Sequence, residues 1–127
     1  MAHELFLDIL EDVNNNYPRN RGADIVAKQV LRACSSIGAN ISEGFGRSQK
    51  RFSNCLDIAK GEANETENWL YKVRYAGFTV SERVTKQLKM TIRVEKMLGS
   101  LKKRVEDYDK KVREHPPQYK IWPPQTN

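Results

Sequence analysis

The residues best placed to do chemistry are the lysines and arginines of the C-terminal third. Within residues 81–112 they recur at intervals of three, four or seven, at Arg83, Lys86, Lys89, Arg93, Lys96, Lys103 and Lys110. In a helix this spacing places them on one face, opposite an apolar stripe. Such a row of cations is suited to bind nucleic-acid phosphates with little sequence preference. The alternative is a solvated face, partly balanced by Glu82, Glu95, Glu106 and Asp107.

A second basic group lies in the segment 43–51, between two predicted helices. Its cations are Arg47, Lys50 and Arg51, and its glycines are Gly44 and Gly46. The free amides at the start of the following helix would lie beside these cations, which predicts a phosphate-binding position. The segment lacks the spacing of a nucleotide-binding P-loop. The simpler interpretation is a capped turn in which Glu43 or Asn40 bonds the backbone.

The charge of the chain is unevenly distributed. The formal net charge is +6. Residues 1–46 hold four Lys/Arg against six Asp/Glu, whereas residues 81–127 hold twelve against six. This asymmetry indicates a polyanionic partner more strongly than a uniform excess would.

The residue types that catalysis needs are scarce. His3 and His115 are the only histidines, and no Glu-x-x-His pair of the di-iron bundle type occurs. Cys34 and Cys55 are predicted to be small buried residues rather than disulfide partners. We therefore expect no enzymatic activity, no cofactor and no bound metal, and interpret Glu62 and Glu65 as surface carboxylates.

Four segments with a 3.6-residue apolar period must position these groups. They span about 4–15, 23–43, 48–76 and 81–112, and no proline occurs between Pro18 and Pro116. Asp24, Ser48 and Ser81 are the predicted N-caps, and Gly77 is the predicted end of the third segment. The pattern predicts an all-α protein, an antiparallel up-down four-helix bundle of residues 1–114. A Pro/aromatic tail follows at residues 115–127, as a frayed end, an arm docked on a neighbouring subunit or a stacking peptide for a partner.

The apolar stripes predict the core. In the first segment Leu5, Phe6, Ile9, Leu10 and Val13 are expected to point inward, with Asp8, Glu11 and Asp12 outward. In the fourth, the inward set is Val84, Leu88, Thr91, Leu98, Leu101, Val105, Tyr108 and Val112.

The second segment is apolar on two neighbouring stripes. One consists of Val26, Val30, Ala33, Ile37 and Ile41, and the other of Ala27, Leu31, Cys34, Gly38 and Phe45. A helix with so wide an apolar arc must be covered on two sides. The helix is either central in its own bundle or covered by another subunit. For the second case the predicted contact residues are Ala33, Ser35, Ser36, Ala39 and Asn40.

The stretch from Ser36 to Arg47, Ser-Ile-Gly-Ala-Asn-Ile-Ser-Glu-Gly-Phe-Gly-Arg, carries a family resemblance. Together with Phe52, Leu56, Ile58, Ala59, Gly61 and Glu65 it resembles the signature of proteins encoded inside intervening sequences of 23S ribosomal RNA genes. Three positions depart from that pattern: Gly38 replaces Pro, Ser42 replaces Ala and Glu62 replaces Ser. The resemblance covers about residues 4–112. It implies a four-helix bundle that assembles as a homopentameric ring.

Relatives of that family include the Avd accessory proteins of diversity-generating retroelements, which work with a reverse transcriptase and its RNA. We therefore expect a non-enzymatic, oligomeric accessory protein that binds the phosphates of RNA or DNA, with RNA as the expected ligand and a reverse transcriptase as a protein partner. The alternative is a protein–protein interaction scaffold without nucleic-acid binding. No apolar run approaches the roughly 18 residues of a membrane span. No basic segment opens the chain, so we expect a cytoplasmic protein without membrane contact.

Overall fold

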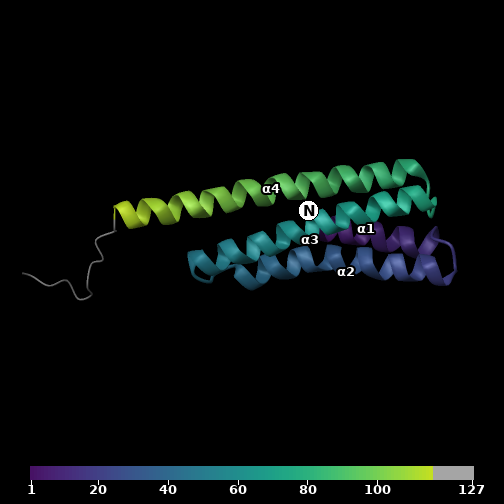
Figure 1. Ribbon diagram of the computed structural model, residues 1–127, viewed down its shortest axis with the longest axis horizontal. Helices are drawn as coiled ribbons and strands as arrows, with labels where there is room; N and C mark the ends of the chain where they lie inside the picture. The colour runs from purple at the N-terminus through teal and green to yellow at the C-terminus, as the bar shows by residue number, and fades with distance from the viewer. Residues whose placement is uncertain (116–127) are drawn as a thin grey trace, which may run out of the picture.

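The computed structural model describes residues 1–115, which form four α-helices and contain no β-strand (Figure 1). The helices are α1 (Ala2–Asn15), α2 (Arg21–Gly44), α3 (Gln49–Ala76) and α4 (Ser81–Glu114). The four predicted helical segments are confirmed, and the architecture is that of an all-helical four-helix bundle. From residue 116 on, the predicted tail lies outside the described residues.

The helix ends show which local signals decide the boundaries. The side chain of Ser48 accepts a hydrogen bond from the backbone N–H of Arg51, as predicted for the N-cap of α3. Gly77 ends α3 in the left-handed conformation, at φ 70°. The other two cap predictions are wrong. Asn20, not Asp24, caps α2 through a bond from the N–H of Ala23, and Ser81 is already the first residue of α4.

The connections between helices lie at two ends of the bundle. The α1–α2 and α3–α4 connections lie at one end, and the α2–α3 connection lies at the other (Figure 1). Helix α1 starts near the middle of the bundle, so it covers only the half beside its own connection to α2 (Figure 1). The remaining half consists of α2, α3 and α4, and the end of α4 extends past the α2–α3 connection.

The core divides accordingly into two apolar clusters. In the half that α1 covers, the cluster is centred on Leu5, Ile9, Val30, Leu70, Val73 and Val84. In the other half, it is centred on Ile37, Leu56, Ala59, Ala63, Val94 and Leu98. These side chains follow the predicted stripes, because one apolar residue per helical turn faces the neighbouring helices.

Asp12 is the clearest departure from the predicted faces. It was expected to point outward, but its side chain is fully buried between α1 and α4. Its spacing explains this position, because Asp12 lies three residues after Ile9 and seven after Leu5, on the buried stripe itself. The helical period assigns this position to the core, and the outward prediction was wrong because it followed the charged residue type.

Two aromatic residues predicted on apolar stripes are exposed. Tyr108 is 57% exposed and Phe45 is 76% exposed. Both belong to the half of the bundle that α1 does not reach (Figure 1). The apolar period of a single helix therefore does not by itself determine which of its aromatic side chains are covered.

Part of the second apolar stripe of α2 is covered within the chain. Ala27 and Cys34 are buried in the same cluster as Leu5 and Ile9 of α1. Of the two explanations for the wide apolar arc, a helix central in its own bundle accounts for these positions. Cys34 and Cys55 are free and buried, and burial raises the pKa of the Cys34 thiol to about 12.

Within residues 1–115, no helix combines the length and apolar character that a membrane crossing requires.

Candidate nucleic-acid interface

The outward face of α4 carries the largest set of unpaired cations predicted from the sequence. Lys89, Arg93, Lys96 and Lys103 are exposed and recur on one side of the helix. None of the four forms an ion pair with a residue in the described part of the chain. From Lys89 to Lys103 the helix rises about 21 Å. These four residues are called the α4 basic face below. Lys110, also predicted in this row, is paired with Glu114 one turn away.

Arg83 and Lys86, predicted in the same row, are bound to carboxylates of α1. Lys86 Nζ lies 3.0 Å from Asp8 Oδ2, and Arg83 lies 3.6 Å from Asp8 and 3.3 Å from Asp12. The N-terminal turns of α4 therefore have much of their positive charge neutralised by α1. The exposed cations of the row that have no ion-pair partner among the described residues begin at Lys89.

Asp12 is the centre of a buried polar network that fixes α1 against α4. It accepts hydrogen bonds from Thr79 Oγ1 at 2.7 Å, Gln87 Nε2 at 3.0 Å and Asn16 Nδ2 at 2.8 Å. A buried carboxylate requires such partners, since burying an unpaired charge is strongly unfavourable. The network fixes the register of α1 on α4, and with it the pairing of Asp8 with Lys86.

Asp8 is held in its charged form by the same contacts. Partial burial raises the pKa of its carboxyl. Hydrogen bonds from Gln87 and Lys86 and the charges of Lys86 and Arg83 lower this pKa by a larger amount. The net pKa lies below the ordinary value, so Asp8 is an anion at neutral pH.

Glu95 does not neutralise the α4 basic face as the sequence suggested. Its side chain is turned toward Glu67 of α3. Burial, a hydrogen bond with Glu67 and the Glu67 charge raise the pKa of Glu95 to about 7, against the opposing charge of Lys60. The pair of carboxyls therefore keeps a proton to a higher pH than an isolated glutamate would. No sequence signal separates Glu95 from an ordinary surface glutamate, because its partner belongs to another helix.

The basic group between α2 and α3 lies in a capped turn. Arg51 is paired with Glu43 at 2.8 Å, which lowers the pKa of Glu43 through the hydrogen bond and the nearby arginine charges. Ser48 already bonds one of the first free amides of α3. Arg47 and Lys50 are exposed and have no ion pair among the described residues. The turn is capped, but by Ser48 and not by Glu43 or Asn40, and phosphate binding here stays a prediction.

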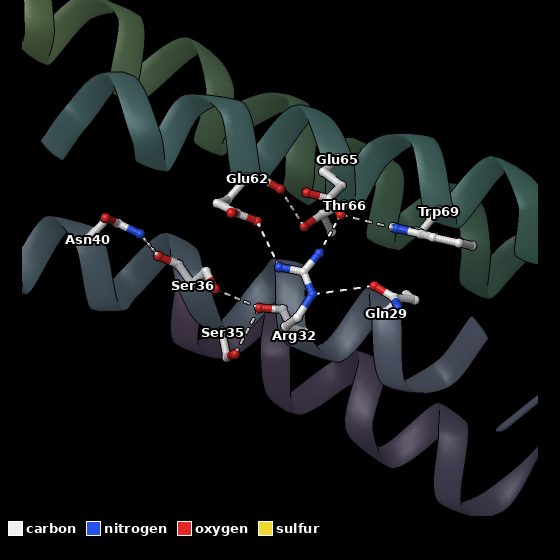
Figure 2. Close-up of polar contacts among 9 residues, drawn as sticks. All are labelled: Gln29, Arg32, Ser35, Ser36, Asn40, Glu62, Glu65, Thr66 and Trp69. Carbon is white, nitrogen blue, oxygen red and sulfur yellow. Dashed lines mark hydrogen bonds and ion pairs between the residues drawn. The ribbon is translucent and has the colours of Figure 1, made fainter. Parts of the chain in front are cut away.

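The small residues of α2, predicted as a subunit contact, are distributed over more than one side of that helix. Ala33 is fully buried inside the chain, so it is a core residue and presents no surface to another subunit. Ser36 and Asn40 are partly buried and bond their own helix, through Arg32 O and Ser36 O (Figure 2). Ser35 and Ala39 are exposed.

Arg32 connects α2 to α3 beside these residues. Its guanidinium pairs with Glu62 at 3.7 Å and with Glu65, which also accepts a 3.4 Å bond from Trp69 Nε1 (Figure 2). The two glutamates were interpreted as simple surface carboxylates, but they anchor one arginine between the helices. Because the arginine is half-exposed, the pairs contribute modestly to stability.

The family signature contains positions that the bundle explains and positions that it does not. Gly44 is required, because a Cβ there would lie 2.7 Å from Cys55 Cβ. A Cβ at Gly61 would meet no atom within 4 Å, and Ile58 is 52% exposed. By helical spacing Ile58 lies on the same face of α3 as Glu62 and Glu65, beside α2. Gly61 and Ile58 thus belong to an exposed surface that packing within this chain does not account for.

Three or more His, Cys, Asp or Glu side chains do not come together as a metal site anywhere in residues 1–115.

Two comparisons with known proteins agree with this arrangement. The family described as 23S rRNA-intervening sequence protein matches residues 1–100. A crystal structure of a protein with unknown function from the S23 ribosomal protein family of Bacteroides thetaiotaomicron is similar, with 32% sequence identity and a TM-score of 0.70. The similarity covers 80% of this chain and 94% of that one. No curated protein matches the chain. The chain belongs to the 23S rRNA-intervening sequence protein family.

Proposed function

We propose that this protein is a non-enzymatic accessory protein that binds the phosphate backbone of nucleic acid on the α4 basic face. The observation that supports this most directly is the row of four exposed cations without ion-pair partners among the described residues. Their ammonium and guanidinium groups would displace condensed counterions from a nucleic acid. RNA is the expected polymer, because the family takes its description from a ribosomal RNA gene element.

The proposed assembly is a homo-oligomer, a ring of five copies. Support comes from exposed small and apolar residues on two helices that pack together, Ala39 on α2 and Ile58 and Gly61 on α3. Small and apolar side chains without cover in the chain allow close approach of a second copy. Five basic faces on one ring would hold one RNA at several points, so weak contacts would multiply through effective concentration. Light scattering that gives the mass of one 14.7 kDa chain at micromolar concentration contradicts this assembly.

The resemblance to Avd proteins makes a reverse transcriptase the proposed protein partner. The competing function is an interaction scaffold that binds proteins and no nucleic acid. The pairing of Arg83 and Lys86 with Asp8 favours that alternative, because it leaves fewer unpaired cations in the exposed row.

A salt titration of the parent protein separates the two functions. Binding to a structured RNA is measured by fluorescence anisotropy at several concentrations of potassium chloride. Backbone binding predicts that the logarithm of affinity falls linearly with the logarithm of salt, by about 0.9 per phosphate contact for a duplex. The absence of binding at low salt supports the scaffold.

A further inference from the structure

Two tyrosines on α3 are exposed, and packing among the described residues does not account for their presence at the surface. Tyr75 is 95% exposed and Tyr71 is 40% exposed. They are four residues apart, so they lie on one side of the helix, separated by a rise of about 6 Å. The buried side of α3 at this level is formed by Leu70 and Val73 instead. Within residues 1–115, neither tyrosine forms a hydrogen bond or pairs with another aromatic ring.

The surface around the tyrosines combines the two aromatic rings with one exposed cation, Lys72. A shallow depression of about 520 Å³ is lined by Asn68, Tyr71, Lys72, Tyr75 and Ala76. Lys72 is exposed, and its Nζ lies 4.8 Å from the centre of the Trp69 ring. The patch contains no branched aliphatic side chain of the kind that a protein-binding groove uses. A ligand with flat rings and negative charge fits this chemistry.

The patch adjoins the α4 basic face. Arg74 donates a hydrogen bond to Thr85 Oγ1 at 2.7 Å, which fixes the last turns of α3 beside the first turns of α4. Thr85 and Lys89 lie one turn apart on α4, and both line a second depression of about 520 Å³ with Lys86 and Arg93. The tyrosines on α3 and the first cation of the α4 basic face therefore lie on neighbouring helices at a similar level.

We propose that Tyr71 and Tyr75 form a stacking platform for unpaired bases of a single-stranded nucleic-acid segment, with Lys72 and Lys89 contacting its phosphates. Aromatic side chains beside cations bind single strands in this way, because every base has a face on which a ring can stack. Bases inside a duplex are already stacked and present no free face. The inference rests on the proposed function and specifies its ligand further, as a nucleic acid with single-stranded regions.

The test compares a double variant that removes both aromatic rings with a double variant that keeps them, each in the intact chain. Tyr71→Leu/Tyr75→Leu removes both rings while keeping apolar bulk and net charge, and Tyr71→Phe/Tyr75→Phe keeps the rings. Tyr108→Leu is the matched control, because Tyr108 is also an exposed tyrosine but belongs to α4. The probes are an oligouridine of about twelve nucleotides and an RNA duplex of the same length. Melting curves and light scattering establish that each variant keeps its fold and its mass.

The double Leu variant is expected to lose about tenfold or more in affinity for oligouridine. Its duplex affinity and its salt slope stay as in the parent, because no charge is removed. The double Phe variant and Tyr108→Leu bind both probes like the parent.

The platform is overturned if the double Leu variant binds oligouridine as tightly as the parent, or loses duplex affinity to the same extent. A change in mass of that variant also overturns it, because the tyrosines then belong to a contact between copies. If the parent binds neither probe, the proposed function itself fails. If the parent binds the duplex and the double Leu variant binds oligouridine as tightly as the parent, only the stacking platform is contradicted.

Discussion

Lys86 Nζ on α4 lies 3.0 Å from Asp8 Oδ2 on α1, and this pair limits the basic surface at its N-terminal end. Arg83 shares the same carboxylate, and Gln87 donates a 3.0 Å hydrogen bond to its other oxygen. A phosphate that approached Lys86 would have to compete with a carboxylate already in place. The first two cations of the row therefore hold α1 on α4, and the later four remain available for a partner.

Asp8→Asn should strengthen binding to RNA, since it releases Lys86 from its anionic partner. We expect a gain of about two- to fivefold at low salt, the size of a partly exposed ion pair. The control is Glu11→Gln, which removes the same charge from an exposed position on α1. Anisotropy titrations of both variants with one RNA measure the difference. Equal gains in the two variants would show that only net charge matters and that Lys86 does not contact RNA.

Gly44→Ala should destabilise the protein, whereas Gly38→Ala should not. A Cβ at Gly44 would lie 2.7 Å from Cys55 Cβ and 3.0 Å from Phe52, while one at Gly38 would meet no atom within 4 Å. Overpacking at Gly44 is expected to cost about 1–3 kcal/mol of unfolding free energy. At Gly38 the higher helix propensity of alanine should give a gain of about 0.5–1 kcal/mol. Urea unfolding of the two variants measures both changes, and equal stabilities would contradict the packing at the α2–α3 turn.

Glu95 should make the stability of the protein fall as the pH rises toward neutral. Its folded-state pKa, about 7, lies above its ordinary value of 4.5, so the folded protein binds an extra proton between those values. The stabilising contribution is therefore complete below about pH 4.5 and is lost as the pH rises through about 7. Glu95→Gln should flatten the fall in melting temperature over this range and melt higher than the parent at pH 8. Asp107→Asn, a substitution at an exposed α4 carboxylate, should leave the slope unchanged. If the melting temperature of Glu95→Gln falls with pH as steeply as that of the parent, the pairing of Glu95 with Glu67 is contradicted.

Local signals predicted the helices well because they act within a few residues. The absence of proline between Pro18 and Pro116, the caps at Ser48 and Gly77 and the apolar periods all operate along one helix. All four helices begin within two residues of the predicted position, and α2 begins at Arg21 instead of residue 23 because Asn20 supplies its cap. Asp12 was misplaced because its residue type was weighed above its helical position.

The site was predicted less well, because it depends on how separate helices are aligned. The row of α4 cations follows from the helical period, but the pairing of Arg83 and Lys86 depends on the register of α1. Tyr108 lies on the predicted apolar stripe and is nevertheless 57% exposed. The exposed Tyr71 and Tyr75 gave no sequence signal, because a tyrosine on an amphipathic helix is compatible with either face. The covered stripe at Ala27 and Cys34 shows that an apolar arc does not by itself indicate a subunit contact.

The central claim, that RNA is bound on the α4 basic face, is tested most directly by two triple variants with equal net charge. Lys89→Gln/Arg93→Gln/Lys96→Gln removes three cations from that face, and Arg19→Gln/Arg21→Gln/Lys28→Gln removes three exposed cations before and within α2. We predict that the α4 variant binds a duplex RNA more weakly for every sequence. Its salt slope should become shallower by about 2.7, at about 0.9 for each lost contact, while the other variant keeps nearly the parent slope. Equal slopes in two folded variants would contradict the claim, because binding would then follow total charge and not this face.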